Sequence, residues 1–151
     1  MSRLADYLFV LALTLWVGAL WSIGYISAPV LFNSLADHAL AGTVAGKQFA
    51  IVAWLGMGCA VYLLAFLLAK EGLVALKAAS FWLAFLMILL TLAGHFGIEP
   101  MLDKLRLQAM PREVMQSVMR DRFATWHGIA SLLYLIQSVL GIVLATQALK
   151  R

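Results

Sequence analysis

Charged residues are absent from four long stretches of this sequence. The stretches cover residues 7–36, 48–69, 78–98 and 123–149, and they contain 30, 22, 21 and 27 residues. A helix of roughly 20 apolar residues crosses the hydrocarbon core of a bilayer, so each stretch is long enough to cross it once. Charged residues make up only 12% of the chain, against about 25% in soluble domains. The scarcity of charge excludes an ordinary soluble domain and predicts an integral membrane protein.

Cysteine and recognisable chemical motifs are also scarce. The single cysteine, Cys59, lies inside the second uncharged stretch, so neither an internal disulfide nor a CxxC metal or redox pair can form. The sequence contains no specific nucleotide, phosphate or metal motif, no Ser-His-Asp arrangement and no pair of carboxylates within an uncharged stretch. These absences leave an enzymatic activity without positive support in the sequence.

The four uncharged stretches predict an all-α fold, an integral membrane four-helix bundle. We expect spans at approximately residues 7–34, 48–69, 78–98 and 123–149, within a single transmembrane domain that covers residues 1–151. The first stretch follows Arg3, as in a secretory signal, but it far exceeds the ~7–15 apolar residues of such a signal. The first span is therefore expected to be retained.

An even number of spans places both termini on one face of the membrane, here called side 1, together with residues 70–77. Side 2 then carries residues 36–47 and 99–122. The basic residues of side 1 are Arg3, Lys70, Lys77, Lys150 and Arg151. Those of side 2 are Lys47, Lys104, Arg106, Arg112, Arg120 and Arg122. The counts of five and six are nearly tied under the positive-inside rule, and the basic tail favours cytoplasmic termini.

The net charge of +4 raises the question of a nucleic-acid partner. No basic run with interleaved aromatic residues is present, and basic residues at the ends of spans ordinarily meet anionic lipid headgroups. The sequence therefore indicates the lipid bilayer, and no nucleic acid, as a partner.

The long side-2 segment between spans 3 and 4 predicts an additional amphipathic helix. We expect Pro100 to end the third span, and Pro111 suits the first turn of a new helix because its missing N–H is not needed there. An apolar strip follows at Val114, Met115, Val118 and Met119. The predicted helix covers Pro111–Arg122 and either lies on the membrane or runs straight into the fourth span.

Two histidines stand near the side-2 ends of antiparallel spans. His95 is near the end of the third stretch and His127 near the start of the fourth, so we expect their side chains to face one another, with Glu99 one turn after His95. The candidate ligand-binding residues are His95, Glu99, Arg120, Arg122, His127, Ser131 and Tyr134. His95 and His127 are also candidate metal ligands. The alternative is a hydrogen-bonded contact that ties two helices together.

Small and weakly polar residues within the spans indicate how the helices pack. His127, Ser131, Tyr134 and Ser138 form one stripe of the fourth span. Small residues four apart are the other signal, because membrane helices approach closely where side chains are small. These pairs are Gly18/Ser22, Gly24/Ala28 and Gly56/Ala60.

Several sequence blocks carry a resemblance to a known family. They are residues 16–21 (WVGALW), 28–32 (APVLF), 41–49 (AGTVAGKQF), 98–100 (IEP) and 123–131 (FATWHGIAS). Together they resemble a bacterial domain-of-unknown-function family related to animal transmembrane protein 205. The resemblance implies a four-span protein of the bacterial inner membrane. The four-span plan is more distantly similar to copper-resistance D proteins and to haem-binding four-helix protoporphyrinogen oxidases, so haem or copper stays open as a cofactor. Those haem enzymes use a histidine early in their spans, whereas spans 1 and 2 here contain none.

Three functional interpretations remain open. The first is a protein that binds or moves a small molecule or metal ion through a polar mouth on side 2. The second is a structural or assembly partner, either as a homo-oligomer or with another membrane protein. The third is a haem-dependent redox enzyme.

Overall fold

The computed structural model describes the backbone of residues 3–108 and 116–149, and the side chains of residues 3–105 and 121–149. The described backbone is almost entirely helical and contains no strand. Four helical segments are long and apolar enough to span a membrane: Arg3–Ser34, His38–Lys77, Ala79–Leu105 and Asp121–Ala148. The predicted all-α membrane bundle is therefore confirmed.

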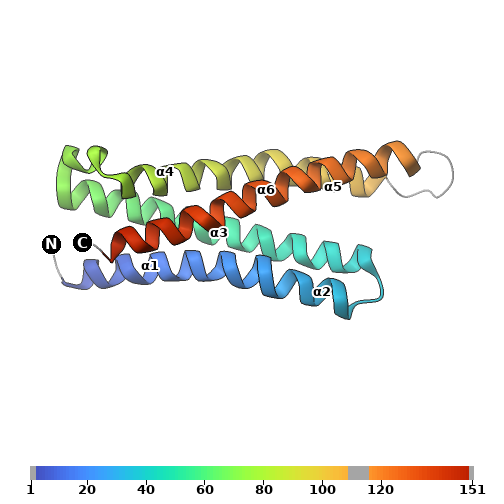
Figure 1. Cartoon of the computed structure of the whole chain (residues 1–151), viewed down its shortest axis with the longest axis horizontal. Coiled ribbons are helices and arrows are strands. Elements are labelled where there is room, and N and C mark those ends of the chain that lie inside the picture. Colours follow the sequence, from blue (N-terminus) through green and yellow to red (C-terminus); the bar gives the residue numbers. More distant parts are fainter. Residues whose placement is uncertain (1–2, 109–115, 150–151) are drawn as a thin grey trace.

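The chain runs up and down four times, and both ends of the described chain lie at the same end of the bundle (Figure 1). The first segment consists of α1 (Arg3–Ser22), a π-helical turn (Ile23–Ser27) and α2 (Ala28–Ser34). The second is α3 (His38–Glu71), followed by a 3₁₀ turn (Gly72–Lys77). The third consists of α4 (Ala79–Leu92), a π-helical turn (Ala93–Ile98) and α5 (Glu99–Gln108), and the fourth is α6 (Gln116–Ala148).

Helix α3 begins ten residues before the uncharged stretch at 48–69 that predicted it. Asp37 caps its first turn, because a side-chain oxygen accepts hydrogen bonds from the amides of Ala39 at 2.9 Å and Leu40 at 3.2 Å. The helix ends at Gly72, whose φ of +59° is a backbone conformation that glycine adopts without strain. The first residue of this helix is His38.

Prolines interrupt the first and third segments without ending them. A proline inside a helix lacks an N–H and its ring collides with the carbonyl four residues earlier. Here each π-helical turn ends two residues before a proline, at Ser27 before Pro29 and at Ile98 before Pro100. A π-helical turn is wider than an α-helical turn, and its backbone hydrogen bonds join residues five apart. Each proline then lies in the first turn of the helix that follows, where its missing N–H is not needed. The prediction that Pro100 ends the helix was wrong for this reason.

The amphipathic helix predicted at Pro111–Arg122 is partly visible. Residues 116–122 are helical and continuous with the fourth segment, as part of α6. Residues 111–115 lie outside the described residues. The structure adds α5 before this gap, where Leu102 and Leu105 are buried, and α5 packs against α6.

The hydrophobic core occupies the half of the bundle nearer side 1. Its largest fully buried side chains include Trp16 and Leu20 on α1, Leu63 and Leu67 on α3, and Met87 on α4. Leu144 of α6 joins the same cluster. All four segments therefore meet around one core in this half of the molecule.

Two glycines allow this close packing. A Cβ atom on Gly56 would lie 2.4 Å from the indole nitrogen of Trp16, and one on Gly24 would lie 2.2 Å from the Tyr134 ring. Both distances are shorter than real Cβ contacts, so a side chain at either position would force its aromatic neighbour to shift. The predicted contact at Gly18/Ser22 was wrong for this bundle, because both residues are exposed and no atom approaches within 4 Å of a Cβ built on Gly18.

We predict that Gly56→Ala lowers stability by about 1–3 kcal/mol, because the added methyl group must displace the buried Trp16 ring. Gly58→Ala in the same helix is the matched control, since nothing lies within 4 Å of its Cβ position. Thermal unfolding in detergent measures both variants. Equal unfolding temperatures for the two variants would contradict the close contact.

We also predict that Ala124→Pro lowers stability by about 3 kcal/mol or more, because Ala124 lies inside α6. Ala36→Pro is the control, since Ala36 lies between α2 and α3, outside both helices. The same unfolding assay compares the two variants. An equal loss in both variants would contradict an effect specific to the helix that contains Ala124.

Candidate functional site

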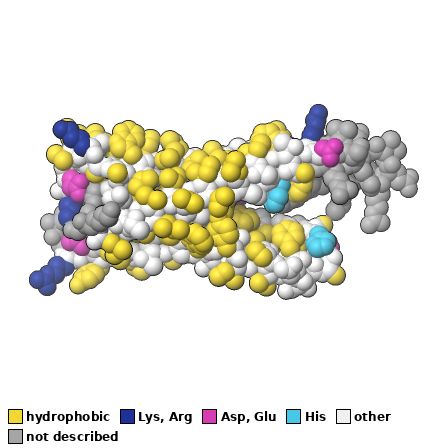
Figure 2. All heavy atoms as spheres, in the orientation of Figure 1, with side chains coloured by type: hydrophobic (Ala, Val, Ile, Leu, Met, Phe, Trp, Pro, Cys, Tyr) yellow, Lys and Arg dark blue, Asp and Glu magenta, His cyan; other side chains and the backbone are white. Residues whose placement is uncertain are grey.

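The bundle is closed toward side 1 and divided toward side 2. In its side-2 half, α2 packs against α3, and α5 packs against α6. Figure 2 shows the surface hollowed between these two pairs of helices, at the end opposite the termini. We call this hollow the side-2 cleft. Its walls are the α2–α3 pair and the α5–α6 pair.

Tyr134 closes the base of the side-2 cleft. Its hydroxyl donates a 2.6 Å hydrogen bond to the Leu20 carbonyl, which joins α6 to α1. Its ring meets Phe49 of α3 edge-on, with 5.1 Å between centroids, and lies 6.2 Å from the Tyr25 ring. The absence of a side chain at Gly24 leaves room for the Tyr134 ring. One aromatic residue therefore holds both walls together where the cleft ends.

His95 forms a second contact across the bundle. Its Nδ1 lies 2.5 Å from a Glu99 carboxylate oxygen, one helical turn away. The two side chains are 14% and 30% exposed, so the pair is partly shielded from its surroundings. The imidazole also meets Trp54 of α3 edge-on at 5.5 Å. The π-helical turn contains His95 and directly precedes Glu99, so the pair lies at the junction between this turn and α5.

The remaining candidate residues lie along α6. His127 is exposed, and its ring stacks on Phe123 at 5.9 Å. Ser131 is exposed, and its hydroxyl donates to the His127 carbonyl at 2.9 Å. Because they share the stripe of Tyr134, they line the α6 wall of the cleft. Arg122 is exposed, and the Arg120 side chain lies outside the described side chains.

The described contacts do not join His95 to His127. The ring of His95 contacts Trp54, whereas the ring of His127 contacts Phe123. Among the described residues, no group of three His, Cys, Asp or Glu side chains is placed to hold a metal ion.

The sequence analysis missed a buried polar contact below the cleft. Gln137 of α6 donates a 2.6 Å hydrogen bond to the Thr91 hydroxyl of α4, which in turn donates to the Met87 carbonyl at 2.9 Å. Both Gln137 and Thr91 are buried. The presence of Gln137 within an uncharged stretch could have predicted this contact, since polar side chains in a membrane normally find partners within the bundle.

Another missed contact lies on the α2–α3 wall. Ser27 donates a 2.8 Å hydrogen bond to the Gln48 side chain, from the first π-helical turn to α3. Each wall therefore carries a polar pair associated with a π-helical turn, Ser27–Gln48 on one wall and His95–Glu99 on the other.

Comparisons with known proteins give one positive result. No curated protein and no solved structure matches the chain. One family model, described as a domain of unknown function (DUF4149), matches residues 11–111, which include most of the first three helical segments. This match covers more than half of the chain, and the protein therefore belongs to the DUF4149 family.

Proposed function

We propose that this membrane protein binds, or moves, a small amphipathic molecule in the side-2 cleft. The proposal rests on a difference in packing between the side-1 half and the side-2 half of the bundle. A continuous core joins all four segments toward side 1, whereas two separate pairs of helices flank a hollow toward side 2. A bundle built only to pack its helices has no need of such a hollow.

The position of the cleft along the helices supports entry from side 2. Counting roughly 20 residues along α3 from Lys70, at the side-1 end, reaches Ala50. Residues 38–49 then extend beyond the hydrocarbon core into the headgroup and aqueous region. Phe49 and its partner Tyr134 mark this level. The base of the cleft therefore lies near the membrane interface, where a molecule with an apolar body and a polar end is stable.

The orientation and the membrane are part of the same proposal. The basic tail at residues 150–151 supports cytoplasmic termini, which places side 2 on the outer face. The sequence blocks that resemble the bacterial family related to transmembrane protein 205 support a location in a bacterial inner membrane. The four-span plan, which is more distantly similar to that of copper-resistance D proteins, supports the same location. Neither resemblance identifies the molecule that is bound.

Single-cysteine labelling tests the cleft, starting from a Cys59→Ala background that has no other cysteine. We predict that Ser131→Cys reacts with a membrane-impermeant maleimide at least about tenfold faster than Leu132→Cys, because a thiol in water ionises and reacts readily. Leu132 is exposed and adjacent in α6, but it points away from the cleft stripe. Equal rates would contradict a water-filled cleft.

The same Ser131→Cys variant reports the orientation. With side 2 outside, the reagent added to intact spheroplasts labels the thiol without permeabilisation. Labelling that appears only after permeabilisation would reverse the proposed orientation.

We further predict that protein purified in mild detergent retains a small molecule, which mass spectrometry detects after denaturation. His95→Gln should lower its amount by about tenfold, because the imidazole that pairs with Glu99 is lost. His38→Gln is the control, since His38 lies at the start of α3 with its ring near Phe32. Retention of no molecule by the unmodified protein would contradict binding and favour a structural role. A Soret band or a bound metal in the same sample would instead favour haem or metal chemistry.

A further inference from the structure

A second pocket lies at the opposite end of the bundle, where three segments meet near side 1. It has a volume of about 440 Å³ and an apolar wall beneath a charged rim. Residues from α1, α3 and α6 line it, among them Asp6, Phe9, Val10, Phe66, Lys70 and Ala148. The acidic residue Glu71 also reaches the pocket.

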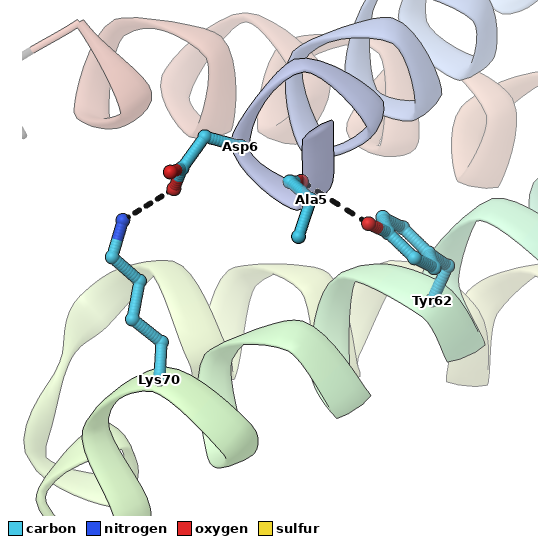
Figure 3. Close-up of polar contacts among 4 residues, drawn as sticks. All are labelled: Ala5, Asp6, Tyr62 and Lys70. Atoms are coloured by element: carbon cyan, nitrogen blue, oxygen red, sulfur yellow. Dashed lines mark hydrogen bonds and ion pairs between the residues drawn. The ribbon is translucent and has the colours of Figure 1, made fainter. Parts of the chain in front are cut away.

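The rim of this pocket contains an ordered ion pair. The Lys70 ammonium lies 2.6 Å from a carboxylate oxygen of Asp6, and the two side chains are 47% and 48% exposed. The Lys70 nitrogen also lies 5.2 Å from the centroid of the Phe66 ring. Figure 3 shows Lys70 reaching from α3 to Asp6 on α1. The positive and negative groups are therefore held side by side and remain accessible.

A neighbouring hydrogen bond fixes the two helices that carry the pair. The Tyr62 hydroxyl of α3 donates to the Ala5 carbonyl of α1 at 3.1 Å, next to the ion pair in Figure 3. The charged rim is thus preorganised, because the Tyr62 side chain already joins α3 to the backbone of α1.

The sequence places this rim at the level of lipid headgroups. Asp6 directly precedes the first uncharged stretch, and Lys70 directly follows the second. The apolar side chains of Phe9, Val10 and Phe66 lie deeper, inside those stretches. The pocket therefore has charges at the headgroup level and an apolar surface at the level of the acyl chains.

We propose that this pocket binds one phospholipid with a zwitterionic headgroup that carries a primary amine, as in phosphatidylethanolamine. The Lys70 ammonium has three N–H donors, and its contact with Asp6 leaves donors for the lipid phosphate. The Asp6 carboxylate accepts several hydrogen bonds and receives the lipid ammonium. One acyl chain lies along Phe9, Val10 and Phe66. This proposal does not rest on the function of the side-2 cleft.

The charges of the pocket distinguish this lipid from two others. A quaternary choline headgroup has no N–H to donate to Asp6. A phosphatidylglycerol headgroup carries a net negative charge and has no ammonium to offer the Asp6 carboxylate. A primary amine beside a phosphate complements both signs of charge.

Native mass spectrometry of the full chain tests the proposal with phosphatidylethanolamine, phosphatidylcholine and phosphatidylglycerol of identical acyl chains. We expect the unmodified protein to retain one phosphatidylethanolamine about tenfold more strongly than either other lipid. Asp6→Asn should abolish this preference over phosphatidylcholine, because the acceptor for the ammonium loses its charge. Lys70→Gln should weaken retention of all three lipids, because each carries a phosphate.

Asp121→Asn on side 2 is the matched control and should keep the preference, since Asp121 is exposed and far along the chain from the pocket. Equal retention of the three lipids by the unmodified protein would overturn the proposal. An unchanged preference in Asp6→Asn, or its loss in Asp121→Asn, would do the same. If Asp6→Asn does not fold, unchanged retention of phosphatidylethanolamine by Lys70→Gln overturns it.

Discussion

The contact between Trp16 and Gly56 is the constraint on which the packing of the bundle depends. In lipid there is no hydrophobic gain from bringing two apolar helices together, so association depends on close fit. The indole of Trp16 is fully buried against the backbone of α3 at a point where any side chain would collide with it. Its N–H has no partner there, which indicates that close packing outweighs the loss of one hydrogen bond. The side-1 core is built around this contact.

The sequence predicted the fold because charge is a strong signal in a membrane. Uncharged stretches identified four segments, but they placed the start of α3 too late, since the Asp37 cap determines where that helix begins. Pro100 misled the prediction because a π-helical turn accommodates it. The spacing of small residues predicted close packing at both Gly24/Ala28 and Gly18/Ser22. Only Gly24 has a close neighbour in the structure, and spacing alone could not distinguish it from Gly18. Small residues four apart show where a close approach is available, and only the bundle decides which face is used.

The candidate site was less predictable for a physical reason. Glu99 lies within one turn of His95, so local spacing was enough to place the two side chains together. Trp54, Phe49 and Gln137 come from segments distant in sequence, and their contacts depend on how the helices tilt and bend. The expected approach of His95 to His127 rested on their positions in antiparallel spans. The described ring contacts join His95 to Trp54 and His127 to Phe123 instead.

The two ends of the bundle also differ in which helices are neighbours. The first and third segments each contain a proline preceded by a π-helical turn, whereas α3 and α6 as described have neither. Beyond these turns, α2 packs against α3 and α5 packs against α6. The hollow in Figure 2 lies between these two pairs of helices. The change from one shared core to two pairs therefore coincides with the two π-helical turns, where Ser27 is hydrogen-bonded to Gln48 of α3 and His95 is paired with Glu99 of α5.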